Sequence, residues 1–493
     1  MASFRLRYPG LYYDEALFTN GAIGADRTTF ITARIWQFPL LLMPYIGALK
    51  SYLYWPIFKI FGVSIFSIRL PMIILMAISF VIVYWFLRKY TNTRTALISI
   101  LFLCTNGSLV AYSRTDSGPI VIEFFLKCLG AFLVIDYFRR KNNYILVAGL
   151  LALFLGVFNK LNFLWFSNAF VVALPVIFWG NIKELPNEKR RFFVIACVTT
   201  FILSVTYYGF ITNYYHLVNG LSMKSLEFMS HNLALTLSGE WCFSGMLKAT
   251  SSMTWALALL TIQVAIMTLA TYLGRRRKTI EHRLLRFSLV LVVLILGQIT
   301  ITPPATGAWH FLVIQPFWFI ALAVAMNALL NIWGHCKLTR IISYSLLGVL
   351  ITSQVILYFR NINSFKSTKN VTWSESTYDL IEETSMLDGS VIVADWGIQT
   401  QLITFDTNPG KYTEVFGPFD LNKNSELLRI KNMYFSSSKD IYIVTHPMDV
   451  AIFPESQANI LTVAEELGDL RKIKVIHDDG RPTFEIYQLI YLK

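Results

Sequence analysis

Acidic residues near the start of the chain are the first whose type and setting could do chemistry. Asp14 and Glu15 lie together in the aromatic stretch 8–18 (YPGLYYDEALF), directly before apolar sequence. A carboxylate in such surroundings can act as a general base toward a hydroxyl or amine. The same pattern also fits a helix N-cap, because Asp is common there, so a structural role stays open.

A second acidic position, Asp116, lies between two apolar runs in the stretch 112–119 (YSRTDSGP). An ionisable residue at the end of a membrane span is costly unless it faces water or a partner, which favours a functional role. The alternative is local pairing with Arg114 and capping of a helix that starts near Pro119.

Cationic residues also occur among apolar neighbours. Lys50 lies in GALKSYLYWP (47–56), Lys160 in GVFNKLN (156–162), and His310 in PPATGAWH (303–310). An interfacial lysine usually extends to lipid headgroups, and an interfacial histidine needs no further role. A phosphate on a lipid, however, requires a cationic pocket at this depth.

Membrane spans must position these residues. The chain has 493 residues, of which 55% are hydrophobic and only 15% charged, too few charges for a soluble protein of this length. A span needs roughly 20 apolar residues. Runs of this kind predict ten spans, at 65–87, 95–112, 119–138, 143–159, 163–180, 192–213, 251–273, 284–302, 310–331 and 339–359.

Basic residues cluster in short loops between these runs, at 88–94, 139–141, 183–191, 275–278 and 337–340. If the ten spans alternate, all five loops lie on one side, which the positive-inside rule makes cytoplasmic. The net charge of +13 therefore indicates membrane topology, and no nucleic-acid partner is expected. The opposite, extracytoplasmic side receives Asp116, Lys160 and everything after residue 360.

Residues 361–493 are predicted to form a soluble extracytoplasmic α/β domain. Its expected elements are strands at 390–394 and 441–445, a helix at 456–470, and a final strand pair near 473–477 and 484–491. We find no catalytic motif in it and expect a capping or acceptor-binding role. The fold class is then an all-α polytopic membrane bundle (63–360) with this domain at its C-terminus.

Residues 1–62 allow two interpretations. The stretch 36–61 is apolar but contains Lys50 and three prolines. It could be a poor span, which would place Asp14 in the cytosol. It could instead form two helices on the outer membrane face, joined near Lys50.

Five scattered cysteines, Cys104, Cys128, Cys197, Cys242 and Cys336, show neither a disulfide framework nor metal-ligand spacing. We therefore expect no required cofactor, although a divalent metal stays possible.

Taken together, these motifs resemble the GT-C fold membrane glycosyltransferases of the family 39 type. That branch contains the dolichyl-phosphate-mannose protein mannosyltransferases and the bacterial aminoarabinose transferases. Asp14-Glu15 is similar to the family's acidic motif in the first outer loop, and 112–116 to its second-loop motif. Residues 47–71 are similar to its juxtamembrane segment, and Asn159-Lys160 lies where relatives carry a Thr-Lys-Gly turn. The resemblance covers roughly the first 180 residues well.

The resemblance implies transfer of a sugar from a polyprenyl-phosphate donor to an extracytoplasmic lipid, protein or glycan. Asp14 would be the base, with Glu15 beside it and Asp116 assisting. The candidates for binding the carrier phosphate are Lys50, Lys160, Arg114 and His310. The resemblance also favours outer-face helices for 1–62 and a bacterial plasma membrane. The family places a span before the acidic motif, whereas thirteen residues precede Asp14 here.

One displacement at the anomeric carbon, inverting its configuration, would complete the reaction, with lysines stabilising the leaving phosphate. An oligosaccharyltransferase or a polymer ligase is the alternative enzyme class, marked in the first case by a metal and a pyrophosphate-linked donor. A transporter or flippase is the non-enzymatic alternative. It would predict charges near span centres, where Glu123 and Lys127, four residues apart, are the main exception to a nearly charge-free pattern.

Overall fold

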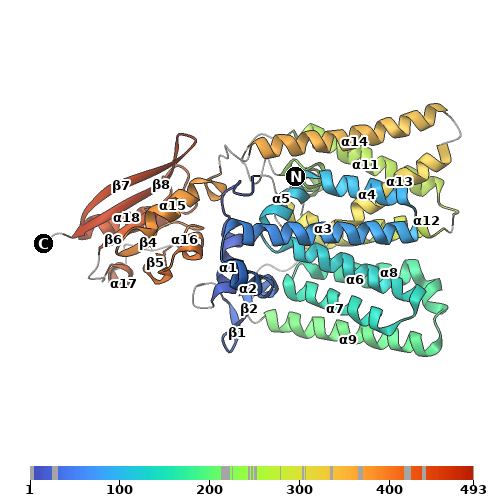
Figure 1. The fold of residues 1–493 in the computed structure, drawn as a ribbon, viewed down its shortest axis with the longest axis horizontal. Helices are drawn as coiled ribbons and strands as arrows, with labels where there is room; N and C mark the ends of the chain where they lie inside the picture. The colour runs from blue at the N-terminus through green and yellow to red at the C-terminus, as the bar shows by residue number, and fades with distance from the viewer. Residues whose placement is uncertain are drawn as a thin grey trace.

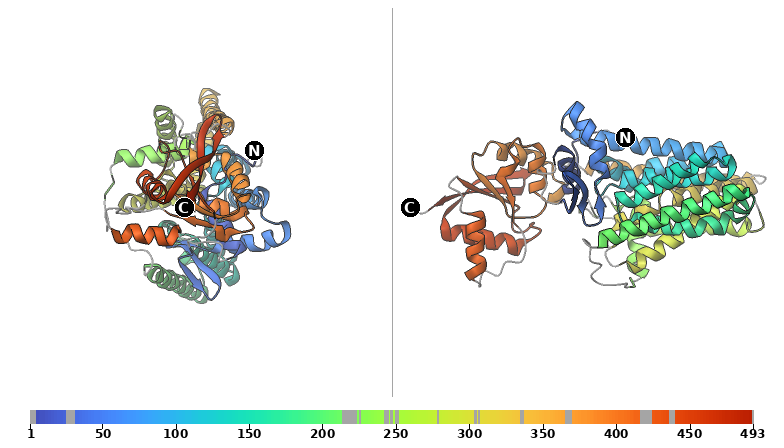
Figure 2. Two further views of the ribbon diagram at one scale, coloured as in Figure 1. Left: turned by 90° about the vertical axis from the view of Figure 1, so that its left-hand side faces the viewer. Right: turned by 90° about the horizontal axis from the view of Figure 1, so that it is seen from below.

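The computed structural model consists of a long helical bundle with a smaller α/β domain at one end (Figure 1). The N-terminal elements lie between the two parts, as a second view also shows (Figure 2). The structure describes residues 5–24, 31–212, 223–224, 226–241, 245, 248, 252–277, 279–302, 305, 307–333, 337–364, 370–415, 424–435 and 440–491.

The bundle contains a helix at each of the ten predicted spans. Its elements are α3 (Ile65–Tyr90), α4 (Thr93–Thr105), α5 (Gly107–Thr115), α6 (Ile120–Arg140), α7 (Asn143–Asn159), α8 (Phe163–Lys183), α9 (Asn187–Thr212), α10 (Leu226–Ser238), α11 (Met253–Leu273), α12 (Ile280–Ile301), η3 (Ala308–Ile314), α13 (Phe317–Trp333) and α14 (Lys337–Ser364). Six of the described helices are long and apolar enough to cross a membrane, and two bent pairs raise the number to eight. The pairs are α4 with α5, bent by 65°, and η3 with α13, bent by 54°.

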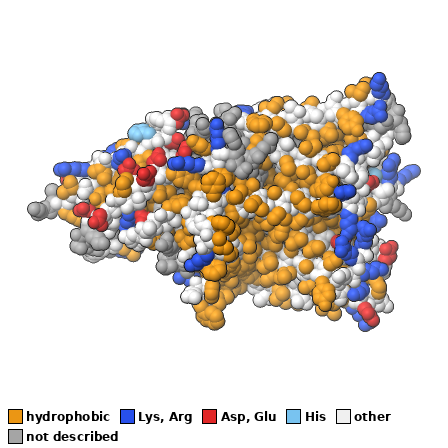
Figure 3. All heavy atoms as spheres, in the orientation of Figure 1, with side chains coloured by type: hydrophobic (Ala, Val, Ile, Leu, Met, Phe, Trp, Pro, Cys, Tyr) orange, Lys and Arg blue, Asp and Glu red, His pale blue; other side chains and the backbone are white. Residues whose placement is uncertain are grey.

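The surface of the bundle fits a membrane. Apolar side chains cover its length in a broad belt, while Lys and Arg gather at the end remote from the α/β domain (Figure 3). Large apolar residues such as Ile74, Trp85 and Val176 are more than half exposed, as is normal for side chains that face lipid rather than water.

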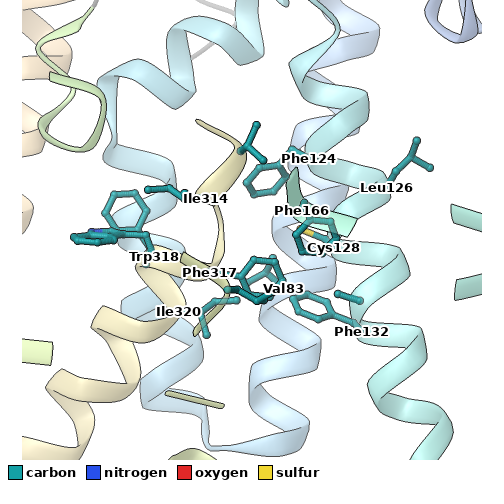
Figure 4. Packing of buried hydrophobic residues seen from close by; sticks show 14 of the residues in the cluster. Val83, Phe124, Leu126, Cys128, Phe132, Phe166, Ile314, Phe317, Trp318 and Ile320 are labelled. Carbon is teal, nitrogen blue, oxygen red and sulfur yellow. The ribbon is translucent and has the colours of Figure 1, made fainter. Parts of the chain in front are cut away.

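The bundle interior is packed with aromatic rings (Figure 4). It also contains a buried ion pair between Lys127 and Glu123. Phe86 stacks on Phe132 with ring centroids 3.8 Å apart. Lys127 Nζ lies 3.8 Å from Glu123 and donates a 2.6 Å hydrogen bond to the Val313 carbonyl. Both residues lie in about the first two turns of α6, so the pair is close to the end of the helix and each charge is the partner of the other. Cys104, Cys128 and Cys197 are free thiols, while Cys242 and Cys336 lie outside the described residues.

Residues 36–61 are neither a span nor two helices. After α1 (Tyr13–Ile23), the chain forms a small antiparallel sheet of β1 (Ala33–Ile35), β2 (Phe38–Met43) and β3 (Ile46–Gly47), and then α2 (Leu49–Phe61). Prolines at 39 and 44 disfavour a helix before Lys50. Gly47 fixes the sheet against the bundle, since a Cβ there would meet the Phe158 carbonyl oxygen at 2.0 Å.

The C-terminal domain has a five-stranded mixed sheet in the order β5-β4-β6-β8-β7. Its strands are β4 (Ser390–Val393), β5 (Tyr412–Glu414), β6 (Ile441–Thr445), β7 (Gly468–Asp478) and β8 (Arg481–Tyr491), and its helices are α15 (Ser376–Ser385), α16 (Gln399–Phe405), α17 (Asn424–Tyr434) and α18 (Pro454–Leu467). β4, β5 and β6 are parallel, and the pair β7–β8 is antiparallel. Two buried apolar clusters hold the sheet and its helices together.

The domain is joined to the N-terminal elements by specific contacts. Asn20 on α1 donates a 2.9 Å hydrogen bond to the Thr400 carbonyl and accepts one of 3.0 Å from Thr404. Gly10 N donates to the Trp373 carbonyl at 2.8 Å. Tyr12 stacks on Trp373 with ring centroids 4.0 Å apart. These contacts hold the domain directly over α1, where the acidic pair lies.

Candidate active site

A cavity of about 1220 Å³ is bounded by the bundle, the N-terminal elements and the C-terminal domain. Its part near the domain, called the chamber below, is lined by Tyr12, Asp14, Gly118, Lys160, His310 and Trp396. Its other part, called the groove, is lined mostly by apolar side chains and runs along α7, α8 and α9, past Leu150, Leu164, Leu174, Ile182, Phe193 and Phe201. The cavity therefore joins a polar head to an apolar channel.

Asp14 faces the chamber from the first turn of α1. Loss of hydration raises the pKa of its carboxyl to about 6, although Lys160 and Lys50 act in the opposite direction. Glu15 and Asp116 add smaller contributions that raise it further. A carboxylate with this pKa is mostly ionised at neutral pH and still basic enough to accept a proton.

Lys160 reaches the same point from the C-terminal end of α7. Its Nζ donates a 3.1 Å hydrogen bond to the Gly118 carbonyl. A Cβ built on Gly118 would lie 2.9 Å from Lys160 Nζ and 3.8 Å from Asp14 Oδ2, so one atom-sized position touches both groups. Gly118 has a φ of +79°, which favours glycine there. Burial lowers the pKa of the Lys160 ammonium.

Glu15 points away from the chamber, into the wall behind it. Its carboxylate receives two hydrogen bonds from Arg69, at 2.7 and 2.8 Å, and both side chains are 0% exposed. Arg69 also donates to the carbonyls of Leu6, Pro9 and Gly10. The pair thereby fixes the segment that leads into α1, which argues against the predicted chemical role for Glu15.

Lys50 and Asp116 form a second buried pair in the wall. Lys50 Nζ lies 3.0 Å from Asp116 Oδ2 and donates a 2.8 Å hydrogen bond to the Asp116 carbonyl. Asp116 Oδ1 accepts a 2.7 Å hydrogen bond from Val121 N and so caps α6. Neither residue lines the cavity. The predicted phosphate-binding role of Lys50 and the predicted assisting role of Asp116 therefore lack direct access to the cavity, because the two side chains pair with each other and Asp116 caps α6.

The two remaining candidates differ in position. Arg114 on α5 is 2% exposed and does not line the cavity. His310 on η3 does line it, between Trp165 and Trp309, with ring centroids 5.7 and 5.4 Å away. Of the seven predicted site residues, Asp14, Lys160 and His310 therefore face the cavity.

This architecture is similar to that of known membrane proteins. Residues 47–208 match the family model described as dolichyl-phosphate-mannose-protein mannosyltransferase. The structure of ArnT from Cupriavidus metallidurans in the apo state superposes over 98% of this chain and 94% of that one, with a TM-score of 0.56 at 11% identity. The structure of the same protein bound to undecaprenyl phosphate superposes over 97% of this chain and 93% of that one, with a TM-score of 0.55 at 12% identity. This chain has the GT-C membrane glycosyltransferase fold.

Similarity to an individual protein sequence covers a smaller part of the chain. An uncharacterized protein of Aquifex aeolicus (strain VF5) is 28% identical over 156 residues. That stretch spans 31% of this chain and 30% of the Aquifex protein. The GT-C fold thus extends over nearly the whole chain, whereas the family model matches residues 47–208.

The cavity is also lined by residues that the sequence does not predict as site residues, and most of them are aromatic or apolar. Tyr45, Trp309 and Trp396 line the chamber. An interfacial tryptophan looks the same in sequence whether it faces lipid or a cavity. Among the described residues no group of three or more His, Cys, Asp or Glu side chains could hold a metal ion. The expectation that the reaction requires no cofactor stays a prediction.

Proposed function

We propose that the chain transfers a sugar from a polyprenyl-phosphate carrier to an acceptor outside the cytoplasm. One observation carries this proposal: Asp14 and Lys160 flank Gly118 in the chamber, where the polar head of the cavity meets the groove. In this proposal Asp14 is the base, and Lys160 is the cation that binds the phosphate of the lipid-linked donor.

The groove suits an isoprenoid tail. Its α8 wall extends from Leu164 to Ile182, which corresponds to about 27 Å at 1.5 Å per residue. This is close to the roughly 30 Å thickness of a hydrocarbon core. The related ArnT structure with bound undecaprenyl phosphate supports the same class of carrier. Nucleotide sugars have no comparable apolar tail to place there.

The proposed reaction is a single displacement. Asp14 accepts the proton of the acceptor hydroxyl as its oxygen bonds to the anomeric carbon. The bond from that carbon to the carrier phosphate breaks, and the phosphate takes the bonding electrons. Lys160 then stabilises the charge on the departing phosphate. One displacement inverts the anomeric configuration.

The proposed orientation places the chamber outside the cytoplasm. The basic loops lie at the end of the bundle opposite the C-terminal domain (Figure 3). The positive-inside rule assigns such an end to the cytoplasm. A bacterial plasma membrane, with the C-terminal domain on its outer face, is the proposed location.

The rate of transfer is expected to depend on pH through both chamber groups. Asp14 must be ionised to act as a base, so kcat/KM should fall about tenfold per pH unit below about pH 6. Lys160 must be protonated, and burial lowers its pKa. Loss of activity should therefore begin at a lower pH than for an ordinary lysine. The measurement is a pH profile of kcat/KM in proteoliposomes, and a flat profile between about pH 5 and pH 7 would contradict the assignment of Asp14.

Lys160→Met tests the phosphate assignment directly. Removal of the only lysine that lines the described cavity should weaken binding of polyprenyl phosphate about 10- to 100-fold, as expected for a charge-assisted contact. Lys160→Arg should restore part of it. The matched control is Lys59→Met, an exposed lysine on α2. Equal affinity of Lys160→Met and wild type for the carrier would remove Lys160 from the site.

A further inference from the structure

The chamber has an aromatic rim that the proposed displacement does not use. We define this aromatic rim as Tyr12, Tyr45, Trp165, Trp309 and Trp396, all of which line the cavity. They come from the N-cap position before α1, the turn before β3, α8, η3 and the loop after β4. Trp309 is 39% exposed and Tyr45 37% exposed. Five separate elements therefore direct aromatic surface at one space.

Packing holds several of these rings in place. Tyr12 stacks on the buried Trp373. Trp396 stacks on Tyr13 with ring centroids 4.7 Å apart, which links the C-terminal domain to α1. Trp309 packs edge-on against Trp241, at 6.1 Å. A ring fixed in this way offers its surface to a ligand at little cost in conformational entropy.

The aromatic rim differs from the aromatic belt found at membrane interfaces. Trp36 and Trp55 are 90% and 56% exposed and do not line the cavity, as expected for residues that anchor a protein among lipid headgroups. The rim residues instead line the same cavity as Asp14 and Lys160. Their position points to recognition of something that enters the chamber.

The charges in the chamber limit what that ligand can be. Among the described lining residues, the only side chain that carries a full positive charge is Lys160, and the only carboxylate is Asp14. The nearby cations Arg69 and Lys50 are bound to Glu15 and Asp116 in the wall. The donor phosphate would use Lys160, so a second phosphate would enter without a cationic partner and lose its hydration.

The other polar groups of the chamber wall are neutral. They are the side chains of Ser117, Asn162, Asn370 and Thr372. The Asn162 Oδ1 atom is buried and receives no hydrogen bond from any described residue. Amide and hydroxyl groups suit hydroxyl-bearing ligands, and a buried acceptor without a donor favours a ligand that supplies one.

We infer that the acceptor is an uncharged glycan, bound by its apolar face to the aromatic rim. This inference rests on the proposed function and names its second substrate. The C–H groups of one sugar face carry partial positive charge, which matches the negative face of an aromatic ring. Trp396 gives the C-terminal domain a direct part in holding the acceptor, with one acceptor hydroxyl toward Asp14.

A panel of acceptors tests the inference with the full-length protein in proteoliposomes and a polyprenyl-phosphate sugar as donor. The acceptors are a neutral oligosaccharide, the same oligosaccharide carrying a phosphate, and a serine-containing peptide. The neutral oligosaccharide should be used with the highest kcat/KM. Preference for the phosphorylated form or for the peptide would overturn the inference. Both outcomes leave the proposed function intact, because the donor is consumed in each.

Variants of the aromatic rim give an independent readout. Trp396→Ala and Trp309→Ala should each raise the KM for the neutral acceptor about tenfold, as expected for loss of one aromatic contact. The affinity for polyprenyl phosphate should stay unchanged. Trp55→Ala, on the exposed face of α2, is the matched control. Unaltered acceptor KM in both rim variants would overturn the inference, whereas failure of wild type to bind polyprenyl phosphate would overturn the proposed function itself.

Discussion

Replacing Asp14 by asparagine is expected to lower kcat for sugar transfer by about 10³-fold, within the range lost with a general base. Asparagine has nearly the same shape but cannot take up the acceptor proton. The fold should tolerate the change, because Asp14 is partly exposed to the cavity and its ionised form is already disfavoured there, as its pKa of about 6 indicates. Affinity for polyprenyl phosphate should stay within a few-fold of wild type.

The measurement is donor turnover in proteoliposomes with matched protein levels, together with carrier binding. Asp379→Asn, an exposed carboxylate on α15, serves as the control and should retain full turnover. Asp14→Glu should keep partial activity, since the base is preserved at a shifted position. Turnover by Asp14→Asn equal to wild type would exclude Asp14 from the chemistry. Loss of carrier binding in that variant would instead indicate a role in placing the donor.

Hydropathy predicts the helices of the bundle because membrane insertion acts locally, although six to eight of the described helices, rather than ten, are long and apolar enough to cross a membrane. Each run of about 20 apolar residues contains enough information to specify a helix. The failure at 36–47 has a different origin. The strands there pair with one another, and β3 also forms a bridge to Lys160 at the end of α7, where Leu161 N donates to the Tyr45 carbonyl at 3.0 Å. That contact joins segments more than a hundred residues apart. The local prolines disfavour a helix, but the local sequence does not predict this pairing.

The same distinction between local signals and distant contacts applies to the candidate site. Asp14 and Lys160 were selected from local motifs, and both face the chamber. The partners of Lys50 and Glu15 were not predicted, because Asp116 and Arg69 are 66 and 54 residues away. The sequence does not show that a lysine and an aspartate far apart in the chain are buried side by side. The sequence therefore identifies which residues are unusual, whereas the fold decides which of them are structural.

The strongest contrast lies between adjacent carboxylates. Glu15→Gln and Arg69→Met are expected to destabilise the protein, with Arg69→Met lowering the free energy of unfolding by about 3–5 kcal/mol. That variant leaves the Glu15 carboxylate buried without its cation and deprives the carbonyls of Leu6, Pro9 and Gly10 of their donor. Glu15→Gln should cost less, because the amide oxygen still accepts from Arg69.

Measurements of thermal stability and of turnover should distinguish the structural pair Glu15 and Arg69 from the proposed base Asp14. Glu15→Gln should lower the temperature of unfolding in detergent, while the protein that stays folded keeps kcat within about tenfold of wild type. Asp14→Asn should keep the temperature of unfolding of wild type and lose kcat. A double-mutant cycle with Glu15→Gln and Arg69→Met should show coupling, because the second change removes a charge that the first has already left unpaired. Normal thermal stability of Glu15→Gln combined with a 10³-fold loss of kcat would reverse the two roles and make Glu15, rather than its neighbour, the base.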